Sequence, residues 1–95
     1  MVTSTSTNID KVARSFSFQI RKSLTPEQLI EVNIENRKRS DGSCATHDFI
    51  DSNVCMNDAF IEVFGEEIDV QDEFHVQIAN AAWDIAKAYD FNLKR

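Results

Sequence analysis

The sequence predicts a mainly α-helical fold, a small three-helix domain with an N-terminal extended segment or short strand. Only two glycines and one proline occur in 95 residues, too few for a turn-rich β-sandwich. The apolar fraction of 42%, with seven phenylalanines and one tryptophan, is typical of a folded protein rather than a disordered acidic chain. A chain of this length has room for one core, so we expect a flexible N-terminus over 1–14 and a single helical domain over 15–95.

The first element is expected to be a strand over 15–21. Polar and apolar residues alternate there, with Phe16, Phe18 and Ile20 on one side. A lone strand would need a second copy of the chain or another segment as its partner. A helical alternative stays open, with Asn8 as its cap and with apolar residues at helical spacing: Ile9, Val12, Ala13, Phe16 and Ile20.

The first helix is expected over 25–38. Thr25 is its N-cap, a proline suits the first helical position, and Gln28 completes a capping box. Leu24 and Leu29 are spaced as a hydrophobic staple across this cap. These signals are local, and they fix where the helix begins.

The second helix is expected over 46–64, with Thr46 as its N-cap and Gly65 as its left-handed C-cap. Its predicted buried side consists of Phe49, Ile50, Asn53, Val54, Met56, Asn57, Phe60, Ile61 and Phe64. The third helix is expected over 70–90. Its predicted apolar stripe consists of Phe74, Ile78, Ala81, Ala82, Ile85 and Tyr89.

Charge is distributed unevenly along the chain, whose formal net charge is −6. No lysine or arginine lies between Arg39 and Lys87, yet this stretch contains eleven carboxylates. They are Asp41, Asp48, Asp51, Asp58, Glu62, Glu66, Glu67, Asp69, Asp72, Glu73 and Asp84. Such an acidic block repels nucleic acid and anionic membranes, and it attracts basic surfaces, especially those of proteins that hold phosphates.

The predicted partner-binding residues form part of this block, and we call them the acidic surface. They are Asp58, Glu62, Glu66, Glu67, Asp69, Asp72 and Glu73. Reversing the five of them from Glu66 to Glu73 to lysine is expected to abolish partner capture without unfolding the domain. The basic run 37–39 could contact phosphate, but beside eleven carboxylates we interpret it as a solvated helix end.

A metal- or ligand-binding regulator is the alternative function. Cys44, His47, Asp51 and Cys55 carry ligand types that suit Zn²⁺, and the last three share one helical stripe with Asp58 and Glu62. Structural zinc sites normally offer two paired clusters, however, and only the distant His75 could add a ligand. We therefore favour a solvated polar face that carries a semi-exposed thiol, with no cofactor, and a structural role for His75.

Enzymatic activity is not expected. His47 with Asp48 and Asp51 could form an acid–base set, and Cys44 or Cys55 could pair with His47 as a nucleophilic dyad. Neither set comes with a predicted pocket or oxyanion hole, and a three-helix domain of this size rarely encloses one. The sequence also lacks a P-loop and a paired-glycine dinucleotide turn.

Amide side chains interrupt the predicted apolar helix faces. Asn53 and Asn57 lie on the second helix, and Asn33 and Asn36 lie on the first. Buried amides need hydrogen-bond partners, so we expect bonds between helices that fix their register. The alternative is a polar binding groove.

Two cysteines are too few for a disulfide scaffold. The first eight residues do not resemble a secretory signal, and no apolar run is long enough to cross a bilayer. We therefore expect a cytoplasmic protein with reduced thiols.

Two segments carry a resemblance to known proteins. The first is Cys44-Ala45-Thr46-His47-Asp48-Phe49, continued by Asp51-Ser52-Asn53, Met56 and Ala59-Phe60, and the second covers residues 80–87. Over residues 16–90 the chain resembles small uncharacterised proteins of phages and mobile elements, although Ile50 stands where such relatives have a cysteine. That departure weakens any shared thiol or metal chemistry.

The resemblance implies a phage or mobile-element setting but no known activity. Short acidic proteins in that setting often block the nucleic-acid-binding machinery of the host. The predicted function is therefore a protein-binding inhibitor or adaptor of the counter-defence type, anti-restriction or anti-CRISPR-like. Its partner would be the basic groove of a nucleic-acid-handling host protein, and a homodimer is a further option.

Overall fold

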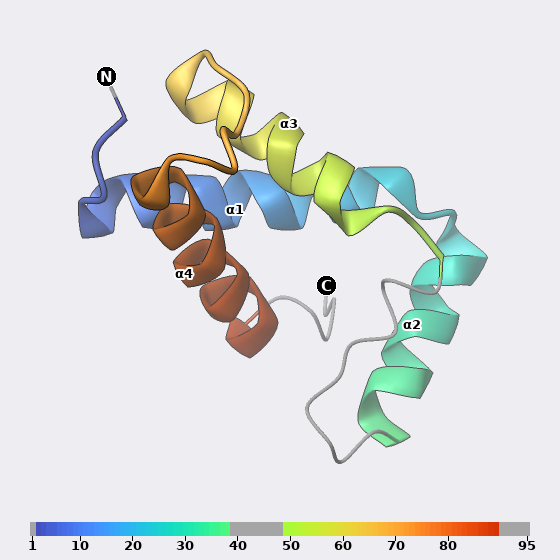
Figure 1. Ribbon diagram of the computed structural model, residues 1–95. Helices are drawn as coiled ribbons and strands as arrows, with labels where there is room; N and C mark the ends of the chain where they lie inside the picture. Colours follow the sequence, from blue (N-terminus) through green and yellow to red (C-terminus); the bar gives the residue numbers. More distant parts are fainter. Residues whose placement is uncertain (1, 39–48, 90–95) are drawn as a thin grey trace.

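The computed structural model describes residues 2–38 and 49–89, and these residues contain four α-helices and no strand (Figure 1). The helices are α1 (Ser6–Ser23), α2 (Pro26–Lys38), α3 (Ser52–Phe64) and α4 (Glu73–Tyr89). The prediction of a small, mainly α-helical fold is confirmed, with one helix more than expected. None of these helices is long and apolar enough to cross a membrane.

Helix α1 replaces the strand that the sequence favoured. Thr5 caps it by accepting the main-chain N–H of Asn8 at 3.2 Å. Val12, Phe16 and Ile20 recur every four residues and are all fully buried, whereas Phe18 is 55% exposed. The alternation over 15–21 was therefore misleading, and the helical alternative is the one found. The predicted domain boundary at residue 14 lies inside this helix.

The capping box of α2 is confirmed. The N–H of Thr25 donates to Gln28 Oε1 at 3.0 Å, and the N–H of Gln28 donates to Thr25 Oγ1 at 3.1 Å. Leu24 and Leu29, the predicted staple, are both buried in the core. The helix then extends away from the other three (Figure 1).

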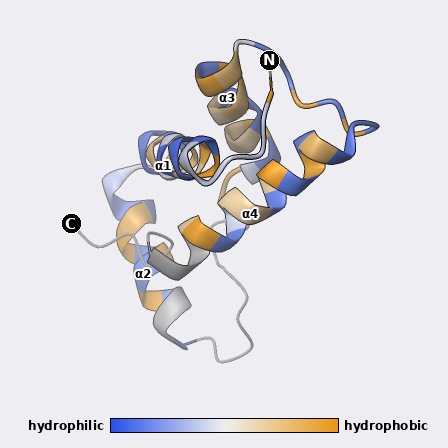
Figure 2. Cartoon of the chain, turned by 90° about the vertical axis from the view of Figure 1, so that its left-hand side faces the viewer, coloured by the Kyte–Doolittle hydropathy of each residue, from blue (hydrophilic) through white to orange (hydrophobic). Residues whose placement is uncertain are grey.

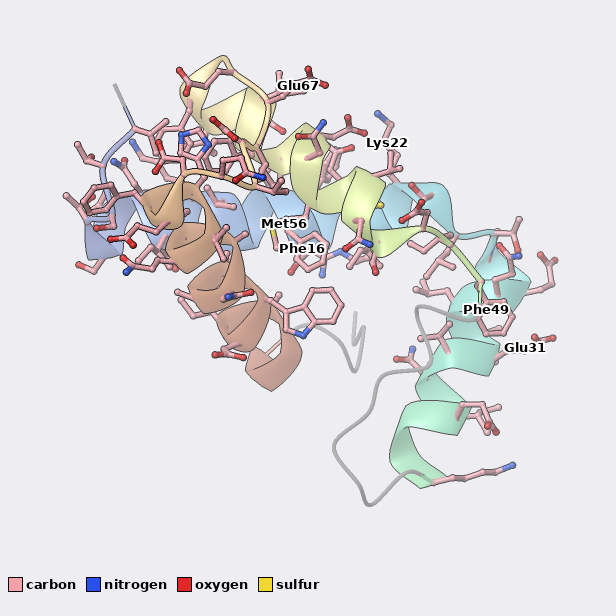
Figure 3. The ribbon with its side chains drawn as sticks, viewed as in Figure 1. Phe16, Lys22, Glu31, Phe49, Met56 and Glu67 are labelled. Atoms are coloured by element: carbon pink, nitrogen blue, oxygen red, sulfur yellow. The ribbon has the colours of Figure 1, made fainter. Side chains whose placement is uncertain are left out.

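Helices α3 and α4 both pack against α1. Figure 2 looks along α1 and shows the two helices on one side of it. Phe16 of α1 stacks on Trp83 of α4 with ring centroids 5.3 Å apart. The crossing of α1 and α3 holds Phe16 and Met56, both buried (Figure 3). The long first helix thus forms the support on which the two acidic helices lie.

Helix α3 begins later than predicted, and the side of it that is buried differs from the predicted side. Its N-cap is Asp51, whose Oδ1 accepts the N–H groups of Asn53 and Val54 at 3.0 and 3.4 Å, while Thr46 lies outside the described residues. The buried residues are Ser52, Cys55, Met56, Ala59 and Phe60. The predicted buried side is thus wrong at Val54 and Ile61, which are exposed.

The ends of the connection between α3 and α4 are set by two residues. Gly65 adopts φ 76° and its N–H donates to Ile61 O at 2.7 Å, which confirms the left-handed C-cap. Asp72 caps α4 by accepting the N–H of Phe74 at 2.9 Å, so α4 begins at Glu73 and not at residue 70. Phe74, expected in the buried stripe, is exposed instead.

Candidate functional site

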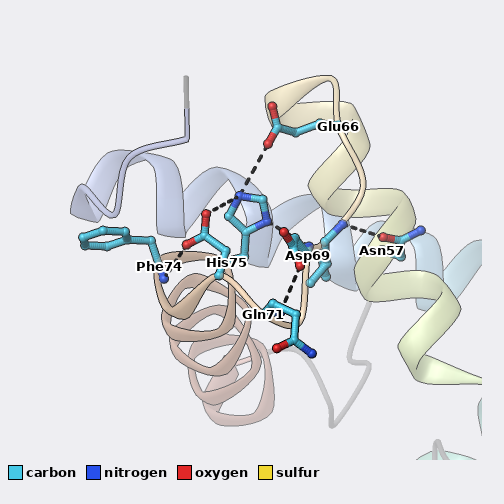
Figure 4. Close-up of polar contacts among 8 residues, drawn as sticks. Asn57, Glu66, Asp69, Gln71, Phe74 and His75 are labelled. Carbon is cyan, nitrogen blue, oxygen red and sulfur yellow. Dashed lines mark hydrogen bonds and ion pairs between the residues drawn. The ribbon is translucent and has the colours of Figure 1, made fainter.

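A buried histidine organises the loop 65–72 between α3 and α4 (Figure 4). His75 is 4% exposed, and its ring lies 4.8 Å from that of Phe60. Its Nδ1 accepts the main-chain N–H of Asp69 at 2.9 Å. Its Nε2 lies 3.4 Å from Glu66 Oε1 and 3.5 Å from Asp72 Oδ2. Both ring nitrogens therefore have partners within the chain.

The hydrogen bond from Asp69 assigns the tautomer of His75. Because Nδ1 accepts a hydrogen bond, the proton of the neutral ring is on Nε2, where it faces the two carboxylates. A metal on Nε2 would require the proton on Nδ1, where it would point at the N–H of Asp69. This geometry agrees with the structural role expected for His75, and no group of three ligand-type side chains among residues 2–38 and 49–89 is placed to hold a metal.

Asn57 holds the same loop from the opposite side. Its Oδ1 accepts the N–H of Ile68 at 2.9 Å, and its Nδ2 donates to Glu67 Oε1 at 3.4 Å. Asn57 thus binds the loop that leads into α4 and not, as expected, another helix. Asn53, one turn earlier, is exposed.

A groove of about 490 Å³ lies between α3, this loop and α4. We call it the α3–α4 groove, and its lining residues are Asn53, Met56 and Asn57 of α3, Ile68 and Val70 of the loop, and Val76, Ala79 and Asn80 of α4. Each helix contributes a residue and those three and four positions after it, which lie on one face of a helix. The result is an apolar surface bordered by amides, and it differs from the polar groove considered as the alternative for Asn53 and Asn57.

Most carboxylates of the acidic surface have partners inside the molecule. Glu62 accepts Ser15 Oγ at 2.6 Å and Gln19 Nε2 at 3.3 Å, which ties α3 to α1. Asp69 Oδ1 accepts the N–H of Gln71 at 2.9 Å. Glu66, Glu67 and Asp72 make the contacts given above. In the described part of the chain, only Asp58 and Glu73 of this set make no such contact.

These internal contacts decide which carboxylates can be reversed in charge without loss of a contact inside the fold. Reversing Asp72 to lysine would remove the cap of α4 and a partner of His75, and reversing Asp69 would remove the acceptor of the Gln71 N–H. These two reversals are therefore expected to destabilise the loop as well as change its charge. Asp84, which the acidic surface did not include, is exposed and makes no side-chain contact with a polar group in the described residues. The cap positions of Asp51 and Asp72 could have been recognised, because aspartate is a preferred residue just before a helix.

The four residues of the metal alternative are only partly described. Asp51 and Cys55 lie at the start of α3, but the Asp51 carboxylate caps the helix and Cys55 is 5% exposed, with its Sγ 3.8 Å from Ser23 Oγ. The expectation of a semi-exposed thiol is therefore wrong. Cys44 and His47 lie outside the described residues, so the complete set stays a prediction.

The buried thiol predicts a specific dependence of stability on pH. Burial raises the pKa of Cys55 above its usual 9.0, the hydrogen bond with Ser23 lowers it, and the charges of Asp58 and Asp51 raise it. The stability that comes from the neutral buried thiol is complete below pH 9.0 and falls as the pH rises further, because the unfolded chain then loses this proton more readily than the folded chain. Urea unfolding at several pH values from neutral to strongly alkaline should therefore show that the advantage of wild type over Cys55→Ala shrinks. A pH-independent difference would contradict the burial of this thiol.

The chain was compared with models of protein families, with curated proteins and with solved structures, and none of the three comparisons gave a match. The resemblance to phage proteins therefore stays a prediction.

Proposed function

We propose that the chain is a protein-binding module, without catalytic activity, that uses α3, the 65–72 loop and α4 to recognise a basic surface on another protein. The observation that carries this proposal is the absence of any lysine or arginine from residues 40–86. No lysine or arginine of α3, of the 65–72 loop or of residues 73–86 in α4 can therefore neutralise the exposed carboxylates of Asp58, Glu73 and Asp84. A basic partner would supply that neutralisation, and the attraction would both steer and orient the encounter.

The class of partner follows from the sign of the charge. A groove lined by lysine and arginine to hold phosphates is the common basic surface of nucleic-acid-handling proteins. A small acidic domain that fills such a groove acts as a stoichiometric inhibitor. Together with the resemblance to phage proteins, this gives the finer form of the proposal, which is inhibition of a host defence protein of the restriction or CRISPR type.

Two charge-reversal variants test the proposal. Glu73→Lys/Asp84→Lys changes two exposed carboxylates of α4, while Glu27→Lys/Glu31→Lys changes two exposed carboxylates of α2 by the same total charge. Glu73 and Glu27 each lie in the first turn of their helix, so the variants also lose similar helix-dipole stabilisation. We expect the α4 variant to bind at least about tenfold more weakly and the α2 variant to bind like wild type.

The measurement has two stages. Affinity capture from the native host identifies the partner, and titration of the purified partner then gives the dissociation constant of each variant. Affinity for wild type should fall steeply with added salt, because exposed charges are screened beyond about 8 Å at physiological ionic strength. Equal losses in the two variants would indicate a response to net charge alone. An unchanged constant in the α4 variant would refute recognition through this part of the chain.

A further inference from the structure

The α3–α4 groove has the size and composition of a binding site for part of a peptide. Its volume of about 490 Å³ falls within the usual range for ligand sites. Its apolar lining includes Met56, Ile68 and Val76, and Val70 at its border is 75% exposed. An apolar side chain placed there would remove both surfaces from water.

Two amides border this apolar surface, and their hydrogen-bonding groups have no partner among the residues that the structure describes. Asn53 of α3 and Asn80 of α4 line the groove, and neither side chain makes a hydrogen bond to another described residue. An asparagine side chain offers one acceptor and two donors, which match the N–H and C=O groups of an extended main chain. Asn57 differs, because its two groups already bind Ile68 and Glu67.

The walls of the groove are held in place without a ligand. Asn57 fixes Ile68, and His75 fixes the neighbouring Asp69, so the loop that carries Ile68 and Val70 is tied to both helices. A segment that binds here need not order the loop, and this lowers the entropic cost of binding.

The charges around the groove specify its occupant. Asp69 stands between two lining residues, Asp84 lies one turn beyond Asn80, and Glu73 lies three residues before Val76. Because residues 40–86 contain no cation, an acidic segment would be repelled and a basic one attracted.

We propose that the α3–α4 groove binds an extended, basic segment of the partner protein. One apolar side chain of the segment lies against Met56 and Ile68, the amides of Asn53 and Asn80 bind its main chain, and flanking lysines or arginines face the carboxylates. This inference rests on the proposed function, to which it adds the binding site and the chemistry of the bound segment.

A displayed library of random peptides of about ten residues, selected on the full chain, supplies the probe. The enriched peptides should carry an apolar residue between lysines or arginines. Their affinity, measured by fluorescence anisotropy, should fall at least about tenfold in Asn53→Ala/Asn80→Ala, and it should be retained in Gln71→Ala/Gln77→Ala, which removes two exposed amides outside the groove. Val70→Ala should weaken binding, whereas Val54→Ala, at an exposed valine that does not line the groove, should not.

Several results would overturn the inference: no enriched peptide, enriched peptides without cations, or equal losses in the groove variants and their controls. The same variants, titrated with the captured partner, separate this inference from the proposed function. If Glu73→Lys/Asp84→Lys weakens binding of the partner and Asn53→Ala/Asn80→Ala does not, recognition through the acidic residues stands. Binding of a partner segment in the groove is then refuted. If neither pair changes the affinity, both proposals fail.

Discussion

Truncation of Phe60 to alanine is expected to lower the free energy of unfolding by about 3–5 kcal/mol and the melting temperature by roughly 12–40 °C. Phe60 is fully buried, and its ring contacts those of Phe64 and His75 at centroid distances of 4.7 and 4.8 Å. It thus joins the end of α3 to the start of α4. Alanine would leave a cavity there that the surrounding helices could fill only in part.

The single tryptophan, Trp83, provides a fluorescence signal for urea unfolding. Because a domain of this size has a stability of only about 5–14 kcal/mol, Phe60→Leu should be measured as well, since it keeps most of the volume and is expected to cost less. Ile61→Ala is the matched control, at the next residue of the helix, where the side chain is 38% exposed. A loss for Phe60→Ala no larger than that for Ile61→Ala would contradict the packing described here.

Local signals in the sequence correctly predicted the start of α2 and the end of α3. The capping box of Thr25 and Gln28 and the left-handed Gly65 both depend on residues within one turn of the end, so the sequence alone contains what is needed. The same reasoning was not applied to Asp51 and Asp72. These two cap the described starts of α3 and α4, and both starts were therefore placed too early.

The choice of buried side required tertiary information. In the N-terminal segment the residue pattern is compatible with both a strand and a helix. The segment is a helix because Val12, Phe16 and Ile20 are buried where it packs against α3 and α4. On α3 the apolar residues favoured Val54 and Ile61, but the buried side combines Met56 and Phe60 with the small residues Ser52, Cys55 and Ala59. Small side chains allow helices to approach closely, and exposed single apolar residues are ordinary on protein surfaces.

The acidic character of the candidate site was evident from the composition, whereas the contacts that each carboxylate makes within the fold were not. Glu62 binds α1, and Asp69 and Asp72 hold the loop, which only the folded chain reveals. The sequence suggested a polar groove beside Asn53 and Asn57, whereas the groove found is mostly apolar. Asn80 joins it because α4 lies beside α3, and no spacing within one helix could have predicted that pairing.

Replacement of His75 by alanine is expected to lower the free energy of unfolding by about 2–4 kcal/mol. Three effects add to one another. The ring leaves a cavity beside Phe60, and the N–H of Asp69 loses its acceptor in a partly buried position. Glu66 and Asp72 would also lose the Nε2–H group that lies between them, although Asp72 keeps the N–H of Phe74 as a donor.

Two further variants separate these contributions. In His75→Asn the amide oxygen can take the place of Nδ1 and accept the N–H of Asp69, whereas in His75→Gln the amide nitrogen can reach the position of Nε2 and donate to Glu66 or Asp72. We expect both to be more stable than His75→Ala, with asparagine alone retaining slow hydrogen exchange at the Asp69 amide. Asn57→Ala is the control, since it should accelerate exchange at Ile68 and leave Asp69 protected. If exchange at Asp69 is unchanged in His75→Ala, the histidine does not hold the loop, and the groove wall must be fixed by Asn57 alone.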